Sequence, residues 1–335
     1  MSKTRDIAAL AKGVQAGDRR ALARAITLVE SGRADHRMQA LELLAALGTE
    51  KQALRIGMSG TPGVGKSTFI ESFGLMLTGM GKRVAVLAVD PSSSRSGGSI
   101  LGDKTRMDHL ARDPQAFIRP SPSQTQLGGV ARRTREAVAL CEAAGFDVVL
   151  IETVGVGQSE TVVAQIADLF VLLLAPAGGD ELQGVKRGIM EMADLILVNK
   201  ADGDLKAQAT RTCADYAGAL RLLRKRAQDP EGFPKAMTVS ALQAYGLQAA
   251  WTEMETLAQW RQDTGVWAQT RQMQANYWFT QDVRQGLVQL LHDDPQTAAR
   301  LEIAQAAVSA GRLSPSAAAA QVLDPLKDRL RKGGE

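Results

Sequence analysis

The chain has 335 residues, of which 45% are hydrophobic, and a formal net charge of +4, so it can bury a sizeable core as one large domain or as a core with appended helices. Its lysines and arginines are scattered and no basic run is interleaved with aromatic residues, which argues against nucleic acid as a partner. The two cysteines exclude a disulfide framework, and no apolar leader or membrane-length apolar stretch is present, so we expect a cytoplasmic protein without membrane contact.

The first fifty residues carry apolar side chains at intervals of three and four, which is the spacing of amphipathic helices. Leu10, Val14, Leu22 and Leu44 belong to this pattern. We therefore predict an N-terminal helical extension over residues 1–50.

Residues 60–68 form a complete Walker A loop between a short apolar run and a helical apolar pattern. The glycines let successive backbone N–H groups point at phosphate oxygens, and the following helix directs its N-terminal dipole at the same anion. We predict that Lys66 contacts the β- and γ-phosphates and that the Ser67 hydroxyl ligates Mg²⁺. The predicted phosphate-binding residues are Gly60, Thr61, Pro62, Gly63, Val64, Gly65, Lys66, Ser67 and Thr68.

Three further acidic residues are candidate ligands of the metal. Asp90 and Glu152 each end an apolar strand-like run, and Asp103 follows a glycine-rich segment. Glu152 also opens an acid-x-x-Gly sequence, which is the form of the Walker B motif and γ-phosphate sensor. All three could reach the sheet edge beside Ser67, where carboxylates and water are the ligands that Mg²⁺ prefers. A turn or helix-cap role remains an alternative for Asp103.

The group that activates water for hydrolysis is not evident from the motifs. In Ras-type GTPases a glutamine directly after the acid-x-x-Gly glycine orients the attacking water, and here that position is Val156. A valine cannot hold a water, so we predict slow intrinsic GTP hydrolysis that a partner stimulates. Lys66 and Glu152 are predicted catalytic residues, with Lys186 and Gln158 as candidates for the missing group.

An Asn-Lys-x-Asp motif follows another strand-like run and predicts guanine recognition. An aspartate carboxylate accepts paired hydrogen bonds from N1–H and the exocyclic amine of guanine, and adenine offers no such pair. A second loop, after a further strand-like run, could place a backbone N–H on the guanine oxygen. The predicted guanine-binding residues are Asn199, Lys200, Asp202, Ser240, Ala241 and Leu242. The predicted cofactors are therefore GTP or GDP together with Mg²⁺.

Between about residues 54 and 240, apolar runs alternate with helical patterns, which predicts parallel strands joined by crossover helices. From residue 246 onward the pattern is helical again. The expected fold class is α/β, a P-loop NTPase with a mostly parallel sheet flanked by helices and with helical extensions at both ends. We place the GTPase core at 51–262 and a C-terminal helical dimerisation region at 263–335.

Four long and unusual segments, at residues 89–107, 118–122, 152–160 and 179–186, resemble the methylmalonyl-CoA mutase-associated GTPase family. That family is also labelled as the lysine–arginine–ornithine transport kinase family. The likeness covers about residues 50–260. It implies a cytosolic homodimer that acts as a chaperone of an adenosylcobalamin-dependent methylmalonyl-CoA mutase or related acyl-CoA mutase, gating cofactor loading and protecting the mutase from inactivation.

The resemblance also assigns roles to residues. Asp90, Asp103 and Glu152 would be Mg²⁺ and switch residues, and the segment 178–186 would be an additional switch facing the mutase. The C-terminal helices would form the dimer contact. No Asp-x-His-x-x-Gly motif for cobalamin is present, so we expect the cobalamin to belong to the partner.

Two other functions remain as alternatives. A metallochaperone GTPase would deliver a metal to an enzyme and would need clustered Cys and His ligands. His36, His109 and His292 are isolated in the sequence, although a site could still be assembled across a dimer. The second alternative, a kinase linked to amino-acid transport, lacks any likeness to a kinase catalytic loop.

Overall fold

The computed structural model describes residues 2–89, 107–120, 127–153, 159–176, 187–223, 226 and 229–332. The chain divides into two compact units, Met1–Gln274 and Ala275–Glu335. The N-terminal helices thus group with the nucleotide core in the first unit. The division into functional parts at residues 50 and 262 stays a prediction.

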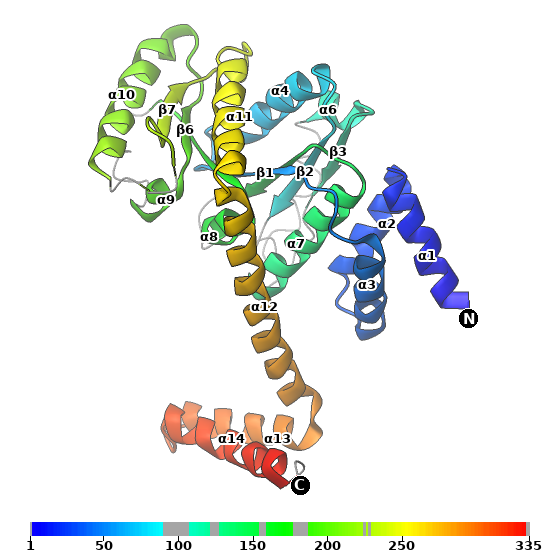
Figure 1. Ribbon diagram of the computed structural model, residues 1–335. Helices are drawn as coiled ribbons and strands as arrows, with labels where there is room; N and C mark the ends of the chain where they lie inside the picture. Colours follow the sequence, from blue (N-terminus) through cyan, green and yellow to red (C-terminus); the bar gives the residue numbers. More distant parts are fainter. Residues whose placement is uncertain are drawn as a thin grey trace. The chain divides into compact units, whose positions relative to one another are not determined.

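A parallel sheet forms the centre of the first unit (Figure 1). Its seven strands have the order β3-β2-β4-β1-β5-β6-β7. The strands are β1 (Leu54–Ser59), β2 (Val84–Val89), β3 (Ala116–Arg119), β4 (Val148–Thr153), β5 (Leu169–Leu174), β6 (Leu195–Val198) and β7 (Lys235–Thr238). Strands β5 and β6 are apolar and buried throughout, as strands covered on both faces must be. The predicted α/β fold with a parallel sheet is confirmed.

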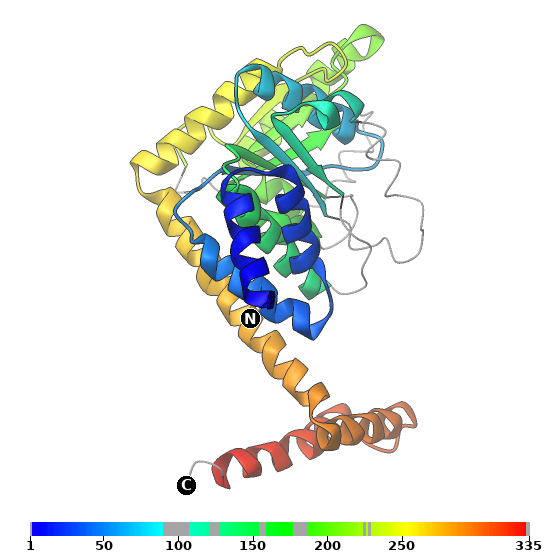
Figure 2. The same cartoon turned by 90° about the vertical axis from the view of Figure 1, so that its right-hand side faces the viewer.

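Helices cover both faces of this sheet. The helical elements of the first unit are α1 (Ser2–Gln15), α2 (Arg19–Glu30), α3 (Ala34–Leu47), α4 (Lys66–Gly79), α6 (Asp108–Arg112), α7 (Leu127–Ala143), α8 (Ser159–Ala164), α9 (Arg187–Met192), the 3₁₀ turn η2 (Gly203–Leu205), α10 (Lys206–Leu222), α11 (Leu247–Asp263) and the beginning of α12 (Val266–Asp293). Helices α1 to α3 contact one another and α7, in front of which they lie in Figure 2. Asp18 starts α2 by accepting hydrogen bonds from two backbone N–H groups of its first turn.

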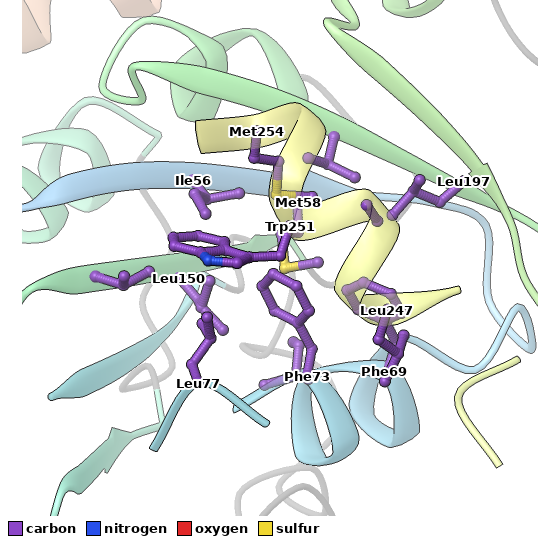
Figure 3. Packing of buried hydrophobic residues seen from close by; sticks show 14 of the residues in the cluster. Ile56, Met58, Phe69, Phe73, Leu77, Leu150, Leu197, Leu247, Trp251 and Met254 are labelled. Atoms are coloured by element: carbon purple, nitrogen blue, oxygen red, sulfur yellow. The ribbon is translucent and has the colours of Figure 1, made fainter. Parts of the chain in front are cut away.

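The hydrophobic core on one face of the sheet is formed by α4 and α11 (Figure 3). Phe69 and Phe73 of α4 stack with ring centroids 5.2 Å apart, and Trp251 of α11 meets Phe73 edge-on at 6.0 Å. Ile56 and Met58 of β1 point into the same cluster and are fully buried. The helix that follows the Walker A loop is therefore fixed to the sheet by its apolar side.

Buried ion pairs lie at the amino ends of the strands, away from the Walker A loop, which follows the carboxyl end of β1. Asp168 lies just before β5 and Asp194 just before β6. Arg271 of α12 pairs with Asp168 at 2.7 Å, while Arg261 of α11 pairs with Asp194 at 2.7 Å and with Asp229 at 2.6 Å. Burial alone would lower the pKa of Arg261, but these two carboxylates outweigh that effect and raise the pKa. The guanidinium therefore stays charged and ties α11 to the ends of the strands.

The second unit contains the end of α12 together with α13 (Pro295–Ser309) and α14 (Pro315–Lys332), which contact each other. Asp294 begins α13 by accepting the backbone N–H of Thr297 at 3.1 Å. Several large apolar side chains of this unit are exposed, among them Phe279 and Ile303. Within the described part of the chain, no helix combines the length and the apolar character needed to cross a membrane.

Gly57 in the middle of β1 permits close packing of the sheet on its other face. A Cβ atom at this position would lie 2.7 Å from Val163 Cγ1 and 3.0 Å from Ala167 Cβ. We expect Gly57→Ala to lower the free energy of unfolding by about 1–3 kcal/mol, because a packed core resists an added methyl group. Urea denaturation measures the change.

Gly218 supplies the matched control for that substitution. It lies inside α10, and a Cβ atom there would meet nothing within 4 Å. Gly218→Ala should therefore raise the free energy of unfolding by about 0.5–1 kcal/mol, the usual gain for this change in an exposed helix. Equal effects of the two substitutions would contradict the packing argument at Gly57.

Candidate functional site

The Walker A loop connects β1 to α4 and depends on its glycines. Gly63 and Gly65 have φ angles of 84° and 89°, which favour glycine. A Cβ atom on Gly60 would lie 2.4 Å from the carbonyl oxygen of Leu173, and one on Gly65 would lie 2.8 Å from Asn199 Nδ2. The loop can therefore approach its neighbours closely only without side chains at these positions.

Helix α4 begins at Lys66, inside the Walker A sequence, and its N-cap residue is Gly65, which has no side chain to cap the helix. Ser67 and Thr68 thus lie in its first turn, where unpaired backbone N–H groups and the helix dipole favour an anion. The Nζ atom of Lys66 donates a hydrogen bond to the carbonyl oxygen of Gly60 at 2.7 Å. This contact holds the lysine charge over the loop that is predicted to bind phosphate.

The Asn-Lys-x-Asp motif follows β6 and is joined to the Walker A loop. Asn199 Nδ2 donates to the carbonyl oxygen of Val64 at 2.9 Å, and Lys200 Nζ donates to that of Gly63 at 2.7 Å. Lys200 has a φ angle of 58°, which is uncommon for a residue with a side chain. Because both side chains donate hydrogen bonds to the loop, the two motifs that were separate in the sequence are directly connected in the structure.

A closed turn after β7 forms the other side of the predicted guanine site. Ser240 and Tyr245 exchange backbone hydrogen bonds of 2.9 and 3.0 Å, which close the turn. The Ser240 hydroxyl donates to the Asp202 carboxylate and also accepts the backbone N–H of Gln243 at 3.1 Å. Asp202 is thereby held in place by the neighbouring loop, as a side chain that reads a base needs to be.

Backbone hydrogen bonds narrow the choice of the donor for the guanine oxygen. The N–H of Ser240 donates to the carbonyl oxygen of Tyr245, and the N–H of Ala241 donates to Asn199 Oδ1 at 3.0 Å. Leu242 N–H has no acceptor among the described residues, and the Leu242 side chain is 80% exposed. Of the three predicted N–H groups, that of Leu242 is the one left for a ligand.

Only part of the predicted metal and catalytic set lies in the described residues. Glu152 is buried near the end of β4, opposite Met58 of β1, and Ser67 is half-buried at the start of α4. Both supply the oxygen atoms that Mg²⁺ prefers. The predicted residues Asp90, Asp103, Val156, Gln158 and Lys186 lie outside the described residues.

Two contacts at this edge had no signal in the sequence. The Thr153 hydroxyl donates to the Ser59 hydroxyl at 3.0 Å, so the end of β4 is linked to the end of β1, directly before the Walker A loop. The Ser72 hydroxyl of α4 donates to the carbonyl oxygen of Ala241 at 2.7 Å. Isolated hydroxyl residues are frequent in helices and strands, and their partners here are distant in the sequence.

The parallel sheet, the glycine-dependent loop at the start of α4 and the guanine motif packed against that loop define the class of the protein: it is a P-loop GTPase. The family follows from comparison with known proteins. Residues 22–296 match the model of the family described as "Methylmalonyl Co-A mutase-associated GTPase MeaB", and the chain belongs to this family.

Similar proteins carry related names. A "Putative GTPase" of Caulobacter vibrioides is 53% identical over 319 residues, covering 95% of this chain and 97% of that protein. The mouse "Methylmalonic aciduria type A homolog, mitochondrial" is 47% identical, covering 95% of this chain and 79% of its own. A solved structure described as "LAO/AO transport system kinase" is 36% identical, with a TM-score of 0.73 and coverage of 96% and 97% of the two chains.

Proposed function

We propose that this GTPase is a chaperone of an adenosylcobalamin-dependent methylmalonyl-CoA mutase or a related acyl-CoA mutase. In this role it gates the loading of the cofactor and protects the mutase from inactivation through nucleotide-dependent loops. The observation that carries the proposal is the match of residues 22–296 to a family described by its association with that mutase. The name of the mouse relative supports the same link.

In this proposal Mg²⁺ accompanies the bound nucleotide. Ser67 and Glu152 would hold the ion together with Asp90 and Asp103, since hydroxyl and carboxylate oxygens suit Mg²⁺. The ion would neutralise charge on the phosphates during transfer of the terminal phosphoryl group to water. Removal of the metal with a chelator should therefore stop turnover.

Hydrolysis would be slow until the partner completes the site. Lys66 would stabilise charge on the transferred phosphoryl group, and Glu152 would act through the metal. Val156 occupies the position where a water-orienting glutamine is found in Ras-type enzymes. Lys186, or alternatively Gln158, would supply the missing function when the mutase is bound.

We further propose that the protein is a cytoplasmic homodimer that associates through residues 263–335. Phe279 and Leu290 on α12 and Ile303 on α13 are 70%, 64% and 71% exposed. A contiguous group of exposed apolar side chains marks a protein interface, and in this proposal the three residues belong to such a group. Sedimentation of the purified protein would give its oligomeric state.

GTP turnover by the purified protein, alone and with a methylmalonyl-CoA mutase added, tests the chaperone proposal. We expect slow hydrolysis of GTP that the mutase accelerates, and no hydrolysis of ATP. Under the linkage of the two binding reactions, a mutase that tightens GTP binding must itself bind more tightly when GTP is present. Turnover that is indifferent to the mutase would remove this partner and leave the GTPase.

The name of the solved relative favours testing one alternative, a transport-linked kinase. A kinase would transfer phosphate to a protein instead of releasing it into solution. The same assay separates a kinase from a GTPase, because radiolabelled γ-phosphate would remain bound to protein if the chain were a kinase.

The metallochaperone alternative gains no support, since the described residues contain no group of three or more His, Cys, Asp or Glu side chains suited to a metal.

A further inference from the structure

Ser72 links the helix of the phosphate loop to the loop that faces the base. It lies in α4, six positions after Lys66, and its hydroxyl donates to the carbonyl oxygen of Ala241 at 2.7 Å. The two residues are 169 positions apart in the sequence. The contact is therefore a tertiary link between two ligand-binding segments and not a local helix interaction.

This hydrogen bond completes a closed network of contacts between the phosphate loop, Asn199 and Ala241. Asn199 donates to Val64 in the phosphate loop and accepts from Ala241 N–H, and Ala241 in turn accepts from Ser72. Ser72 belongs to α4, which begins in the phosphate loop, so the chain of contacts starts and ends at that loop. The N–H and the carbonyl group of Ala241 are both fixed in this way.

The hydrogen bond from Ser72 to the carbonyl of Ala241 also orients the N–H of the next residue, Leu242. The carbonyl of Ala241 and the N–H of Leu242 belong to one planar peptide group, in which the two bonds point in opposite directions when the bond is trans. The peptide before Leu242 is not among the cis bonds of the described chain. A hydroxyl that fixes the carbonyl of Ala241 therefore also fixes the direction of Leu242 N–H.

We propose that Ser72 is a positioning residue for guanine recognition, which it serves by aiming Leu242 N–H at the O6 atom of the base. Hydrogen bonding at the carbonyl also polarises the peptide group and strengthens its N–H as a donor. The inference rests on guanine binding and on the assignment of O6 to Leu242, and it is independent of the mutase.

The test compares Ser72→Ala with the unchanged protein against two ligands. GDP and 6-thio-GDP differ at position 6, where sulfur accepts hydrogen bonds more weakly than oxygen. Dissociation constants come from displacement of a fluorescent ribose-labelled GDP. We expect Ser72→Ala to weaken GDP binding by about fivefold, the usual effect of one hydrogen bond, and to change 6-thio-GDP binding by less than about twofold.

Two further variants separate positioning from a general structural effect. Ser72→Thr keeps the hydroxyl and should retain the affinity for GDP. Thr78→Val is the matched control, because the Thr78 hydroxyl donates to the carbonyl oxygen of Leu75 within the same helix at 3.1 Å, whereas Ser72 donates to Ala241. This control should leave the preference for GDP over 6-thio-GDP unchanged.

The proposal fails if Ser72→Ala weakens both ligands equally, since that result would indicate general damage to the site. It fails as well if GDP affinity is unchanged in Ser72→Ala. If the unchanged protein itself binds the two ligands equally, the assignment of O6 to Leu242 is wrong and the inference falls with it. GTP turnover with and without a mutase would still test the proposed function separately.

Discussion

Replacing Asp202 with asparagine should shift the base preference from guanine to xanthine. The carboxylate of Asp202 is predicted to accept hydrogen bonds from N1–H and the exocyclic amine of guanine, and each such bond to a charged group would contribute about 1.5–3 kcal/mol. Loss of this pairing should weaken GDP binding by roughly two to four orders of magnitude. The amide of asparagine can instead donate to the carbonyl group that xanthine carries in place of the amine.

Competition between GDP and xanthosine diphosphate for the purified variant measures this shift. Asp204→Asn provides a matched control, because Asp204 is an exposed acid two positions further on, in the turn η2. The control should keep the original preference. Retention of GDP preference by Asp202→Asn would show that another residue reads the base.

The second large effect concerns stability and lies at Arg261. Its guanidinium pairs with Asp194 and Asp229 and also donates to the carbonyl oxygen of Asp168 at 2.7 Å. Removal of one partner from a buried ion pair typically costs about 3–5 kcal/mol, since the remaining charges lose their compensation. Arg226, which also pairs with Asp194 at 2.7 Å, should keep the loss from Arg261→Met near the lower end of this range.

Urea denaturation of the full chain measures the predicted loss. Lys327→Ala is the comparison, because the ion pair of Lys327 with Asp324 is exposed and pairs of that kind contribute less than about 1 kcal/mol. The affinity for GDP should remain close to that of the unchanged protein in Arg261→Met at low temperature. A change of less than about 1 kcal/mol on removal of Arg261 would contradict the importance assigned to this cluster.

Much of the fold follows from local patterns in the sequence. The apolar runs that end at Val89, Ile151 and Val198 predict strands because strands buried on both faces must be continuously apolar. The order of the strands in the sheet was not predictable in the same way. It depends on which faces of the crossover helices pack together, and the runs themselves are too similar to specify their neighbours.

The nucleotide motifs were recognisable because each needs particular residues at fixed spacing. The contact between the two motifs was not recognisable in the sequence. The hydrogen bond of Asn199 to Val64 spans 135 positions and forms only when β6 and β1 enter one sheet. The same holds for Ser72, which is one hydroxyl among many along the chain. The acids before β5 and β6 did carry a signal, because a charged residue directly before a buried strand requires a partner.

The nucleotide loops leave the sheet at the carboxyl ends of its strands, while the ion pairs of Arg261 and Arg271 lie at the amino ends. Inherited or engineered substitutions can therefore be sorted by the edge on which they fall. Changes at the amino end should reduce the amount of folded protein in a cell, and a lower growth temperature should restore part of that amount. Changes to polar side chains of the nucleotide motifs at the carboxyl end, such as Asp202, should leave abundance intact and alter which nucleotide is bound. Measuring abundance and nucleotide occupancy together would distinguish the two kinds of defect.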